Sequence, residues 1–403
     1  MQVAFKAEQS HAPAETTDAP IRVMLVDDSA VVRGLFSRLL ESDPGIKVIT
    51  SVANGKMAVN SLNHQEIDVV VLDIEMPVMD GMEALPKMLA LKPDVPILMA
   101  STLTLRNAEI SMKALADGAA DYLPKPASTK EIGAEGGFRR ELLEKVRNLG
   151  LARRRRIARA GATAGSAPKT RPGAFSKPTS TGMPRTHETA EANARRLPGT
   201  GFTLREAGRE PVEVVAIGSS TGGPQALFEV LKGLRGGCRQ PILITQHMPA
   251  TFTTILAQHI NRMTGWDCVE GETGMPITGG RVLVAPGGYH MVVERQGSQN
   301  VIRLDDGPEV NFCRPAVDPL FDSIAAVYGG HALGIILTGM GTDGLRGATK
   351  MVEAGGTILA QNEATSVVWG MPGAAAGAGI CSDVLPVGDM ASKVVRLLTR
   401  RGR

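Results

Sequence analysis

The chain has 403 residues, of which 43% are hydrophobic and 21% charged, with a formal net charge of +3. This composition excludes a wholly disordered chain, a collagen and a small disulfide scaffold. No apolar run has the length of a membrane span or a signal peptide, and the four scattered cysteines lack a CxxC pair, so we expect a cytoplasmic protein without membrane insertion.

The charge is unevenly distributed along the chain. Residues 139–205 contain 16 Lys or Arg against 4 Asp or Glu, a net charge of +12, whereas the rest contains 28 against 37, a net charge of −9. Since much of this stretch is rich in Pro, Gly and Ser, we predict a basic flexible linker over 141–205 and a disordered tail over 1–20. A nucleic-acid-binding arm is the alternative, but the interleaved aromatic residues that stack bases are missing, so we expect no nucleic-acid partner.

Before the linker, apolar strands alternate with amphipathic helices, which predicts a parallel sheet with helices on both faces. The expected strands are short apolar runs, namely Arg22–Val26, Lys47–Val52, Asp68–Leu72, Pro96–Ala100 and Asp121–Leu123. Helices are expected over Ala30–Glu41 and Ala108–Asp117. In an open sheet of this kind, ligands bind beyond the carboxyl ends of the strands.

Polar residues stand at these strand ends: Asp27, Asp28, Asp73, Ser101 and Lys125. Carboxylates that are brought together repel one another unless a cation holds them, and hard oxygen ligands suit Mg²⁺. A lysine and a hydroxyl opposite the carboxylates suit a phosphoryl group. The pattern therefore predicts a carboxylate that can be phosphorylated, with a metal ion that neutralises the developing charge.

This segment resembles the flavodoxin-like receiver domain of two-component response regulators through the text VDDS, VLDIEMPVMDG and LPKP. The resemblance implies that Asp73 is the phospho-accepting residue. It also implies that Asp27, Asp28 and Asp73 bind Mg²⁺, helped by the backbone carbonyl of Glu75.

The same resemblance assigns further roles around the phosphoryl group. It implies that Ser101 is the switch hydroxyl and that Lys125 is the phosphate partner. Tyr122 stands where receivers carry an aromatic residue that changes its packing with the hydroxyl. We therefore expect a receiver domain over 21–140.

After the linker, the apolar run Val212–Ile217 leads into GSSTGG and then into a helix expected from Pro224 to Leu234. Residues 218–222 satisfy G-x-S-x-G, in which the central serine, here Ser220, is held on a sharp strand-to-helix turn. From the loop alone, a phosphate cradle at the helix N-terminus remains an equal alternative. The loop is neither a P-loop nor a G-x-G-x-x-G fingerprint.

A nucleophilic serine needs a base and an orienting carboxylate. His247 comes just after the apolar run Pro241–Thr245, so it is expected at the same sheet edge as the serine. Asp343 lies on a glycine-rich loop after the apolar run Ala332–Leu337, where a helix cap is its alternative role. These residues are the best candidates for the base and the acid.

Two other polar residues have weaker assignments. His290 follows a glycine turn and is a possible substrate contact, although a structural role is also open. Asp318 begins a helical stretch, so we expect it at the surface.

The second half resembles the catalytic domain of the CheB family of chemotaxis protein-glutamate methylesterases. The matching segments are AIGSSTGGP, QHMP, VAPGGYHM, LTGMGTDG and QNEATSVVWGMPGAA. The resemblance implies a doubly wound, parallel-sheet hydrolase domain over 206–403 that needs no cofactor for the esterase reaction. It also implies roles for Ser220 as nucleophile, His247 as general base, Asp343 as orienting acid and the Met340 N–H in the oxyanion hole.

Taken together, the two resemblances imply an α/β enzyme with a regulatory first domain. The expected function is hydrolysis of glutamate γ-methyl esters, with deamidation of specific glutamines, on methyl-accepting chemotaxis proteins. The expected phosphodonor is the chemotaxis histidine kinase CheA, and the receiver is expected to cover the catalytic cleft until it is phosphorylated. The alternative is a response regulator with a nucleotide- or DNA-binding output.

Overall fold

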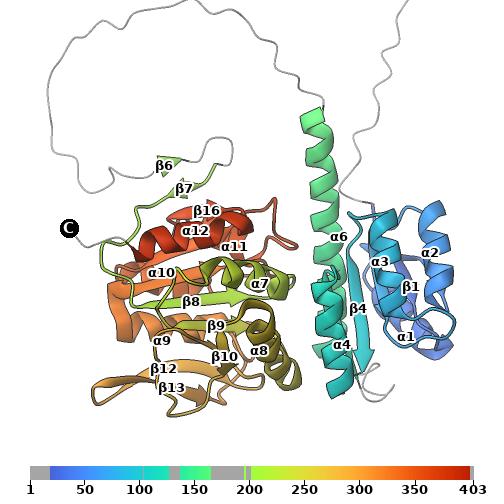
Figure 1. The fold of residues 1–403 in the computed structure, drawn as a ribbon. Helices are drawn as coiled ribbons and strands as arrows, with labels where there is room; N and C mark the ends of the chain where they lie inside the picture. The colour runs from blue at the N-terminus through green and yellow to red at the C-terminus, as the bar shows by residue number, and fades with distance from the viewer. Residues whose placement is uncertain (1–18, 103, 127–136, 165–194, 197–200, 400–403) are drawn as a thin grey trace, which may run out of the picture.

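The computed structural model describes residues 19–102, 104–126, 137–164, 195–196 and 201–399. These residues form two α/β domains, each built on a parallel sheet (Figure 1). Residues 1–18 of the predicted tail lie outside the described residues, as do 165–194 and 197–200 of the predicted linker.

The first domain has a five-stranded parallel sheet in the order β2-β1-β3-β4-β5. Its strands are β1 (Ile21–Val26), β2 (Ile46–Val52), β3 (Val69–Asp73), β4 (Ile97–Thr102) and β5 (Asp121–Lys125). Its first four helices are α1 (Ala30–Glu41), α2 (Gly55–His64), α3 (Gly81–Leu91) and α4 (Leu105–Ala116). Each strand expected from the sequence is present, and the flavodoxin-like order is confirmed.

Side-chain caps fix where the helices of this domain begin. The Ser29 hydroxyl accepts a hydrogen bond from the Val32 N–H at the start of α1, and the Thr104 hydroxyl accepts one from the Asn107 N–H at the start of α4. These caps satisfy donors that the first helical turn would leave unpaired. The carboxyl edge of the sheet therefore lies directly beside well-defined helix starts.

The structure differs from the expected linker at its beginning. Residues Gly137–Ala164 form one helix, α6, which packs on the first domain. Leu142, Val146 and Leu149 are fully buried in the core that α6 shares with β1. Their spacing of four and three residues places them on one helix face, so this apolar stripe decides the packing although the segment is strongly basic.

Buried charge also ties α6 to the first domain. The Asp68 carboxylate is inaccessible to solvent and forms ion pairs with Arg22, Arg153 and Arg154. Burial alone would raise the pKa of Asp68, but hydrogen bonds from Arg22 and Arg154 lower it to about 2. Part of the basic run therefore forms buried ion pairs that hold α6 on the first domain, and is not a solvated linker.

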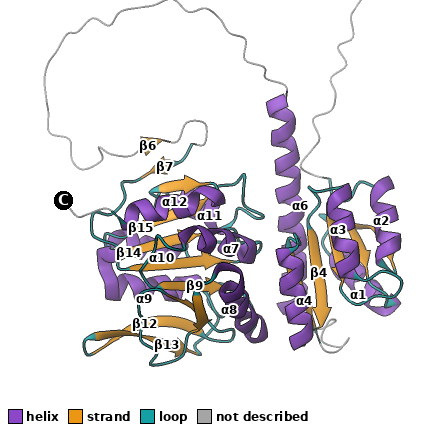
Figure 2. Ribbon diagram, in the orientation of Figure 1, coloured by secondary structure: helices purple, strands orange, loops and turns teal. Residues whose placement is uncertain are grey.

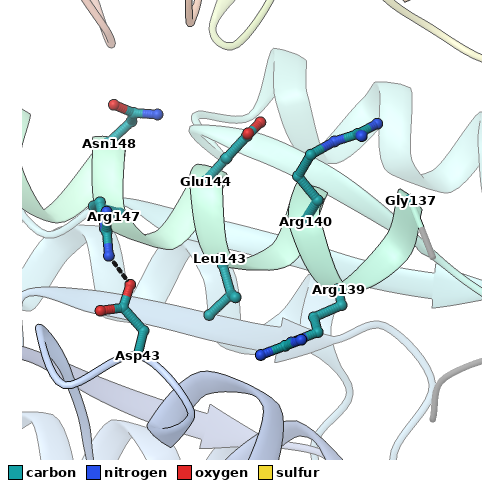
Figure 3. Close-up of a pocket in the computed structure, with 8 residues that line it drawn as sticks. All are labelled: Asp43, Gly137, Arg139, Arg140, Leu143, Glu144, Arg147 and Asn148. Atoms are coloured by element: carbon teal, nitrogen blue, oxygen red, sulfur yellow. Dashed lines mark hydrogen bonds and ion pairs between the residues drawn. The ribbon is translucent and has the colours of Figure 1, made fainter. Parts of the chain in front are cut away.

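The first turns of α6 line a surface cavity of about 630 Å³. Figure 3 shows Arg147 and Leu143 pointing towards the loop that carries Asp43, whereas Arg140 and Glu144 point the other way. None of the expected site residues lines this cavity.

The second domain has a seven-stranded parallel sheet in the order β10-β11-β9-β8-β14-β15-β16 (Figure 2). Its strands are β8 (Val214–Ser219), β9 (Ile242–Gln246), β10 (Asp267–Glu270), β11 (Arg281–Val284), β14 (Ala332–Ile336), β15 (Thr357–Gln361) and β16 (Asp383–Leu385). From β8 the chain first adds β9, β10 and β11 on one side of the sheet and then β14, β15 and β16 on the other. A topological switch point therefore lies between β8 and β14. Ligands of doubly wound sheets bind at such a point.

Helices cover both faces of this sheet. They are α7 (Gly223–Leu234), α8 (Ala250–Thr264), α9 (Val317–Tyr328), α10 (Leu345–Glu353), α11 (Met371–Gly377) and α12 (Val387–Leu398), with a short 3₁₀ helix, η1 (Gly329–His331). Two antiparallel pairs lie outside the sheet, β6 (Arg195–Arg196) with β7 (Thr203–Leu204) and β12 (His290–Gln296) with β13 (Gln299–Asp305). Among the residues that the structure describes, no helix combines the length and apolar character that a membrane span needs.

The two domains meet through helix α4 and strand β5. Helix α4 packs against α7 and α8 of the second domain (Figure 1). The Tyr122 ring stacks on the Phe252 ring of α8, with 4.2 Å between centroids and 12° between planes. Both rings are buried, so this contact removes aromatic surface of both domains from water.

Candidate active site

Ser220 lies on a tight turn at the carboxyl end of β8. Its N–H donates to the Thr338 carbonyl at 3.0 Å, and its carbonyl accepts from the Gly223 N–H at 2.7 Å. Gly222 caps α7 with a φ of 76°, a left-handed conformation that glycine adopts without strain. The turn therefore presents Ser220 at the start of a helix, as the G-x-S-x-G pattern predicts.

The loop after β14 lies against this turn. A Cβ atom on Gly339 would come within 2.8 Å of Ser220 Cβ and 2.4 Å of Met371 Sδ. Only glycine allows two backbone segments to approach so closely.

Gln246, the last residue of β9, braces the turn from the other side. The Ser219 hydroxyl donates to Gln246 Oε1 at 2.7 Å, and Gln246 Nε2 donates to the Ser220 carbonyl at 2.9 Å. Sequence reasoning missed Gln246, although a polar residue at the end of an apolar strand and just before His247 was a usable signal.

His247 and Asp343 form a close pair. His247 Nε2 lies 2.7 Å from Asp343 Oδ2, and Asp343 also accepts from the Val317 and Asp318 N–H groups at the start of α9. Burial alone would raise the pKa of Asp343, but the bond to His247, the Val317 N–H and the Asn311 amide lower it. The carboxylate is therefore held ionised at a helix N-terminus, where negative charge is favoured.

The other ring nitrogen of His247, Nδ1, lies 3.4 Å from Cys313 Sγ. Within the described residues, the Ser220 hydroxyl makes no hydrogen bond, to His247 or to any other group. Burial alone would lower the pKa of His247, but Cys313 and Asp343 raise it. Because Nε2 is engaged by Asp343, Nδ1 is the nitrogen through which His247 can act as a base towards Ser220.

Two backbone N–H groups near Ser220 have no hydrogen-bond partner among the described residues. They belong to Met340, on the loop after β14, and to Thr221, the residue after the serine. The Met340 side chain packs with Val367 and Val368 against the first domain. Unpartnered N–H groups beside a nucleophile are suited to hold a developing oxyanion.

The first domain reaches the residue next to Ser220. Thr221 Oγ1 donates to Asp121 Oδ2 of β5 at 2.7 Å, and both side chains are buried. The Asp121 carboxylate is also paired with Lys145 of α6 at 3.0 Å. The serine turn is therefore covered by the first domain in this structure.

The carboxylates expected at the first sheet edge are brought together. Oxygen atoms of Asp27, Asp28 and Asp73 lie within 4.8 Å of one another, and Lys125 Nζ lies 2.6 Å from Asp27 Oδ2 and 2.7 Å from Asp73 Oδ1. Burial raises the pKa of Asp73 to about 6, although Lys125 opposes the shift. Three hard oxygen donors and buried negative charge fit a Mg²⁺ ion.

Glu75 and Ser101 flank this cluster. Glu75 lines a cavity of about 520 Å³ together with Asp28. The buried Ser101 hydroxyl lies 3.1 Å from the Ser111 hydroxyl of α4, so in this structure it bonds to the helix that contacts the second domain.

The two weaker assignments take structural roles. His290 is buried, and its ring nitrogens bond the Pro308 carbonyl and the Ala316 N–H. Asp318, expected at the surface, is 4% exposed because its carboxylate accepts from the Gly347 N–H at 2.8 Å and from Asn311.

Comparisons with known proteins agree with the two-domain architecture. The model of the CheB methylesterase family matches residues 215–394, and that of the response regulator receiver domain matches residues 23–135. The chain is 54% identical to protein-glutamate methylesterase/protein-glutamine glutaminase 1 of Paramagnetospirillum magneticum, over 96% of this chain and 99% of the relative.

Two further matches are a second relative and a solved structure. The chain is 56% identical to the protein-glutamate methylesterase/protein-glutamine glutaminase of the group 2 operon of Rhodospirillum centenum, over 95% of each chain. The crystal structure of the Thermotoga maritima CheB methylesterase catalytic domain matches with 37% identity and a TM-score of 0.45, covering 47% of this chain and 100% of that one.

Proposed function

The chain belongs to the CheB methylesterase family and carries a response regulator receiver domain, and we propose that it hydrolyses glutamate γ-methyl esters on methyl-accepting chemotaxis proteins. The observation that carries this proposal is the His247–Asp343 pair at the same sheet edge as the Ser220 turn. The relatives' names also include glutaminase, so we extend the proposal to deamidation of specific glutamines.

In the proposed mechanism, Ser220 Oγ attacks the ester carbonyl carbon while His247 Nδ1 takes the hydroxyl proton. The Met340 and Thr221 N–H groups stabilise the tetrahedral oxyanion, and one such donor contributes about 3 kcal/mol. As the carbon–oxygen bond breaks, His247 gives the proton to the departing methanol. Asp343 stabilises the imidazolium throughout.

Deacylation repeats these proton transfers with water. His247 takes a proton from the water that attacks the acyl-enzyme and then returns it to Ser220 Oγ, which releases a glutamate side chain. A glutamine amide follows the same course with ammonia as the leaving group. No cofactor is needed for either reaction, because the serine, the imidazole and the backbone donors supply every group that these steps use.

For the receiver domain, we propose that Asp73 accepts a phosphoryl group from the chemotaxis histidine kinase CheA. Asp27, Asp28, Asp73 and the Glu75 carbonyl would hold Mg²⁺, which neutralises charge on the transferring group. Lys125 would then pair with the phosphoryl oxygens instead of the two carboxylates that it contacts here.

We propose that the receiver inhibits the esterase by covering the Ser220 turn. A phosphoryl group on Asp73 would draw the Ser101 hydroxyl away from Ser111, which removes a contact with α4. Because α4 packs on α7 and α8, this change would weaken the interface and expose the Ser220 turn. The four free cysteines agree with a cytoplasmic location, where reduced thiols persist.

A methanol-release assay tests the proposed function. The full chain is incubated with membranes that contain a methylated chemotaxis receptor, with and without acetyl phosphate as phosphodonor. We expect release in both conditions and more with the phosphodonor. Absence of release in both conditions would contradict the proposed substrate.

Asp73→Asn is expected to abolish phosphorylation by acetyl phosphate, because an amide cannot form the acyl phosphate. Labelling is measured with ³²P-labelled acetyl phosphate, and EDTA added before the phosphodonor should prevent labelling of the wild type. Asp80→Asn is the matched control, because Asp80 lies outside the carboxylate cluster and only caps α3. Full labelling of Asp73→Asn would show that another residue accepts the phosphoryl group.

Gln225→Ala is expected to raise the activity of the unphosphorylated chain. Gln225, on α7, donates to the Leu115 carbonyl at 2.7 Å and to the Ala119 carbonyl at 2.5 Å, both across the domain interface. Each such bond contributes about 1 kcal/mol, so their loss should raise the open population roughly tenfold or more while the closed state dominates. The measurement is initial methanol release without phosphodonor.

Gln240→Ala is the matched control for this variant. Gln240 makes a comparable bond, to the Val212 carbonyl at 3.2 Å, but within the second domain. It should leave the unphosphorylated rate close to that of the wild type. Equal rates for Gln225→Ala and Gln240→Ala would argue against inhibition by the interface.

A further inference from the structure

A tight turn, Val310–Cys313, lies beside the His247–Asp343 pair. Val310 and Cys313 exchange two backbone hydrogen bonds, of 3.1 and 3.0 Å. The two residues between them have positive φ angles, 53° at Asn311 and 61° at Phe312, which is the conformation of a type I′ turn. Asparagine tolerates this conformation, but phenylalanine is strained in it, and such strain persists where the surroundings hold the backbone.

Asn311 bridges two buried carboxylates. Its Nδ2 donates to Asp343 Oδ1 at 2.9 Å and to Asp318 Oδ2 at 3.1 Å. The two carboxylates are 2% and 4% exposed, so their charges face each other with little water between them. One amide group thus supplies a donor to each carboxylate and stands between them.

Cys313 of the turn faces the active site, whereas Phe312 faces outward. Cys313 contacts His247 Nδ1, the nitrogen that does not bond Asp343. Phe312 is 69% exposed, and the Arg140 guanidinium of α6 lies over its ring at 4.1 Å. The turn therefore touches both members of the pair from one side while its tip faces outward.

We propose that Asn311, in the Val310–Cys313 turn, is a positioning residue of the active site, and that it holds the Asp343 carboxylate against His247 and apart from Asp318. This inference rests on the proposed esterase function. Asn311 does not touch the reacting atoms, so it acts through Asp343 as a positioning residue.

The charges around Asp343 explain why such a residue is needed. His247 faces one oxygen of the Asp343 carboxylate, and the Asp318 carboxylate lies on the other side of the Asn311 amide. Arg346 Nε lies 3.7 Å from Asp318 Oδ2. Burial and the charge of Asp343 raise the pKa of Asp318, while the Gly347 N–H and Asn311 oppose this shift. Without the amide, the two carboxylates would repel each other, and Asp343 would turn away from His247 or become protonated.

Asn311→Gly is the decisive variant, because glycine keeps the positive φ of the turn and removes only the amide. In the full chain with acetyl phosphate, we expect kcat for methanol release to fall roughly 100-fold, the loss that a small misplacement of a catalytic group causes. KM should change little, because no substrate contact is removed. The acid limb of the kcat–pH profile should move to lower pH, because an Asp343 that turns away or becomes protonated no longer helps to raise the pKa of His247.

Phe312→Gly is the matched control, since it makes the same backbone change at the neighbouring position and removes a side chain that points outward. Its kcat in acetyl phosphate should stay within about twofold of the wild type. Asp318→Asn in the Asn311→Gly background should restore part of the lost rate, because it removes the repelling charge. A general loss of folding would not be reversed in this way.

The outcomes separate this inference from the proposed function. If the wild type releases methanol and Asn311→Gly matches it in kcat and pH profile, Asn311 does not position Asp343. If Asn311→Gly is slow but Asp318→Asn restores nothing and the acid limb does not move, the charge argument is wrong. If the wild type itself releases no methanol, the proposed function fails instead.

Discussion

Ser220→Ala should abolish methanol release, with a fall in kcat of roughly 10⁶-fold, the size seen when a triad nucleophile is removed. The alanine methyl group fits the same space, but no oxygen remains to attack the ester. The backbone contacts of the turn, through the Thr338 carbonyl and the Gly223 N–H, are unaffected. The variant should therefore fold normally, and its thermal unfolding should match that of the wild type.

Ser219→Ala provides the control on the adjacent residue. Ser219 donates to Gln246 and is fully buried, so its loss should cost about 1 kcal/mol of folding stability and reduce the rate far less. Deamidation of a receptor glutamine should respond in parallel with ester hydrolysis. If Ser219→Ala were inactive and Ser220→Ala active, the nucleophile would be the neighbouring serine and the proposed geometry would be wrong.

The positions of the polar residues at the strand ends could be predicted, because the carboxyl ends of parallel strands lie at the same edge of a sheet. Asp27 and Asp73 follow apolar strands directly, and the structure brings them to one lysine. His247 and Asp343 likewise follow buried strands, and the structure pairs them at 2.7 Å. Strands β3, β9 and β14 are buried along their whole length, so each is a continuous apolar run whose end is visible in the sequence, and parallel pairing brings those ends to one edge of each sheet.

Contacts made by irregular segments could not be predicted in this way. Gln246, Asn311 and Cys313 reach the site through a strand end and a tight turn whose place depends on tertiary packing. Nothing in local periodicity says that a turn 30 residues before Asp343 in the sequence lies beside it. A type I′ turn with phenylalanine at a positive φ is also contrary to residue preference, so it had no sequence signal.

In the basic segment, the sequence predicted a flexible linker where the structure has a packed helix. Its net charge suggested a solvated linker, but an apolar stripe within it forms the buried face of α6. Arg153 is 4% exposed and paired with Asp68 and Asp94, so composition averaged over the segment hid a specific role. Arg140 of the same helix lies over the Phe312 ring, so α6 also contacts the turn that carries Asn311.

Asp343→Asn should lower kcat for methanol release roughly 10⁴-fold, or about 5 kcal/mol in activation free energy. The carboxylate accepts from His247 and from the Val317 N–H and stabilises the imidazolium that forms when Ser220 loses its proton. An asparagine would present an N–H to one of these donors, so the imidazole would adopt the wrong tautomer or turn away. The pKa of His247 should also fall, because the charge that helps to raise it is gone.

Asp322→Asn is a suitable control for this variant, because Asp322 is a half-buried carboxylate of α9 that pairs with Lys350 and Arg346 rather than with the imidazole. We expect its kcat to stay close to that of the wild type. The kcat–pH profile adds a second readout, since the acid limb of Asp343→Asn should move to lower pH as the imidazole loses its carboxylate partner. A variant that kept the wild-type rate and profile would mean that Asp343 only caps the start of α9, and His247 would then need a different orienting group.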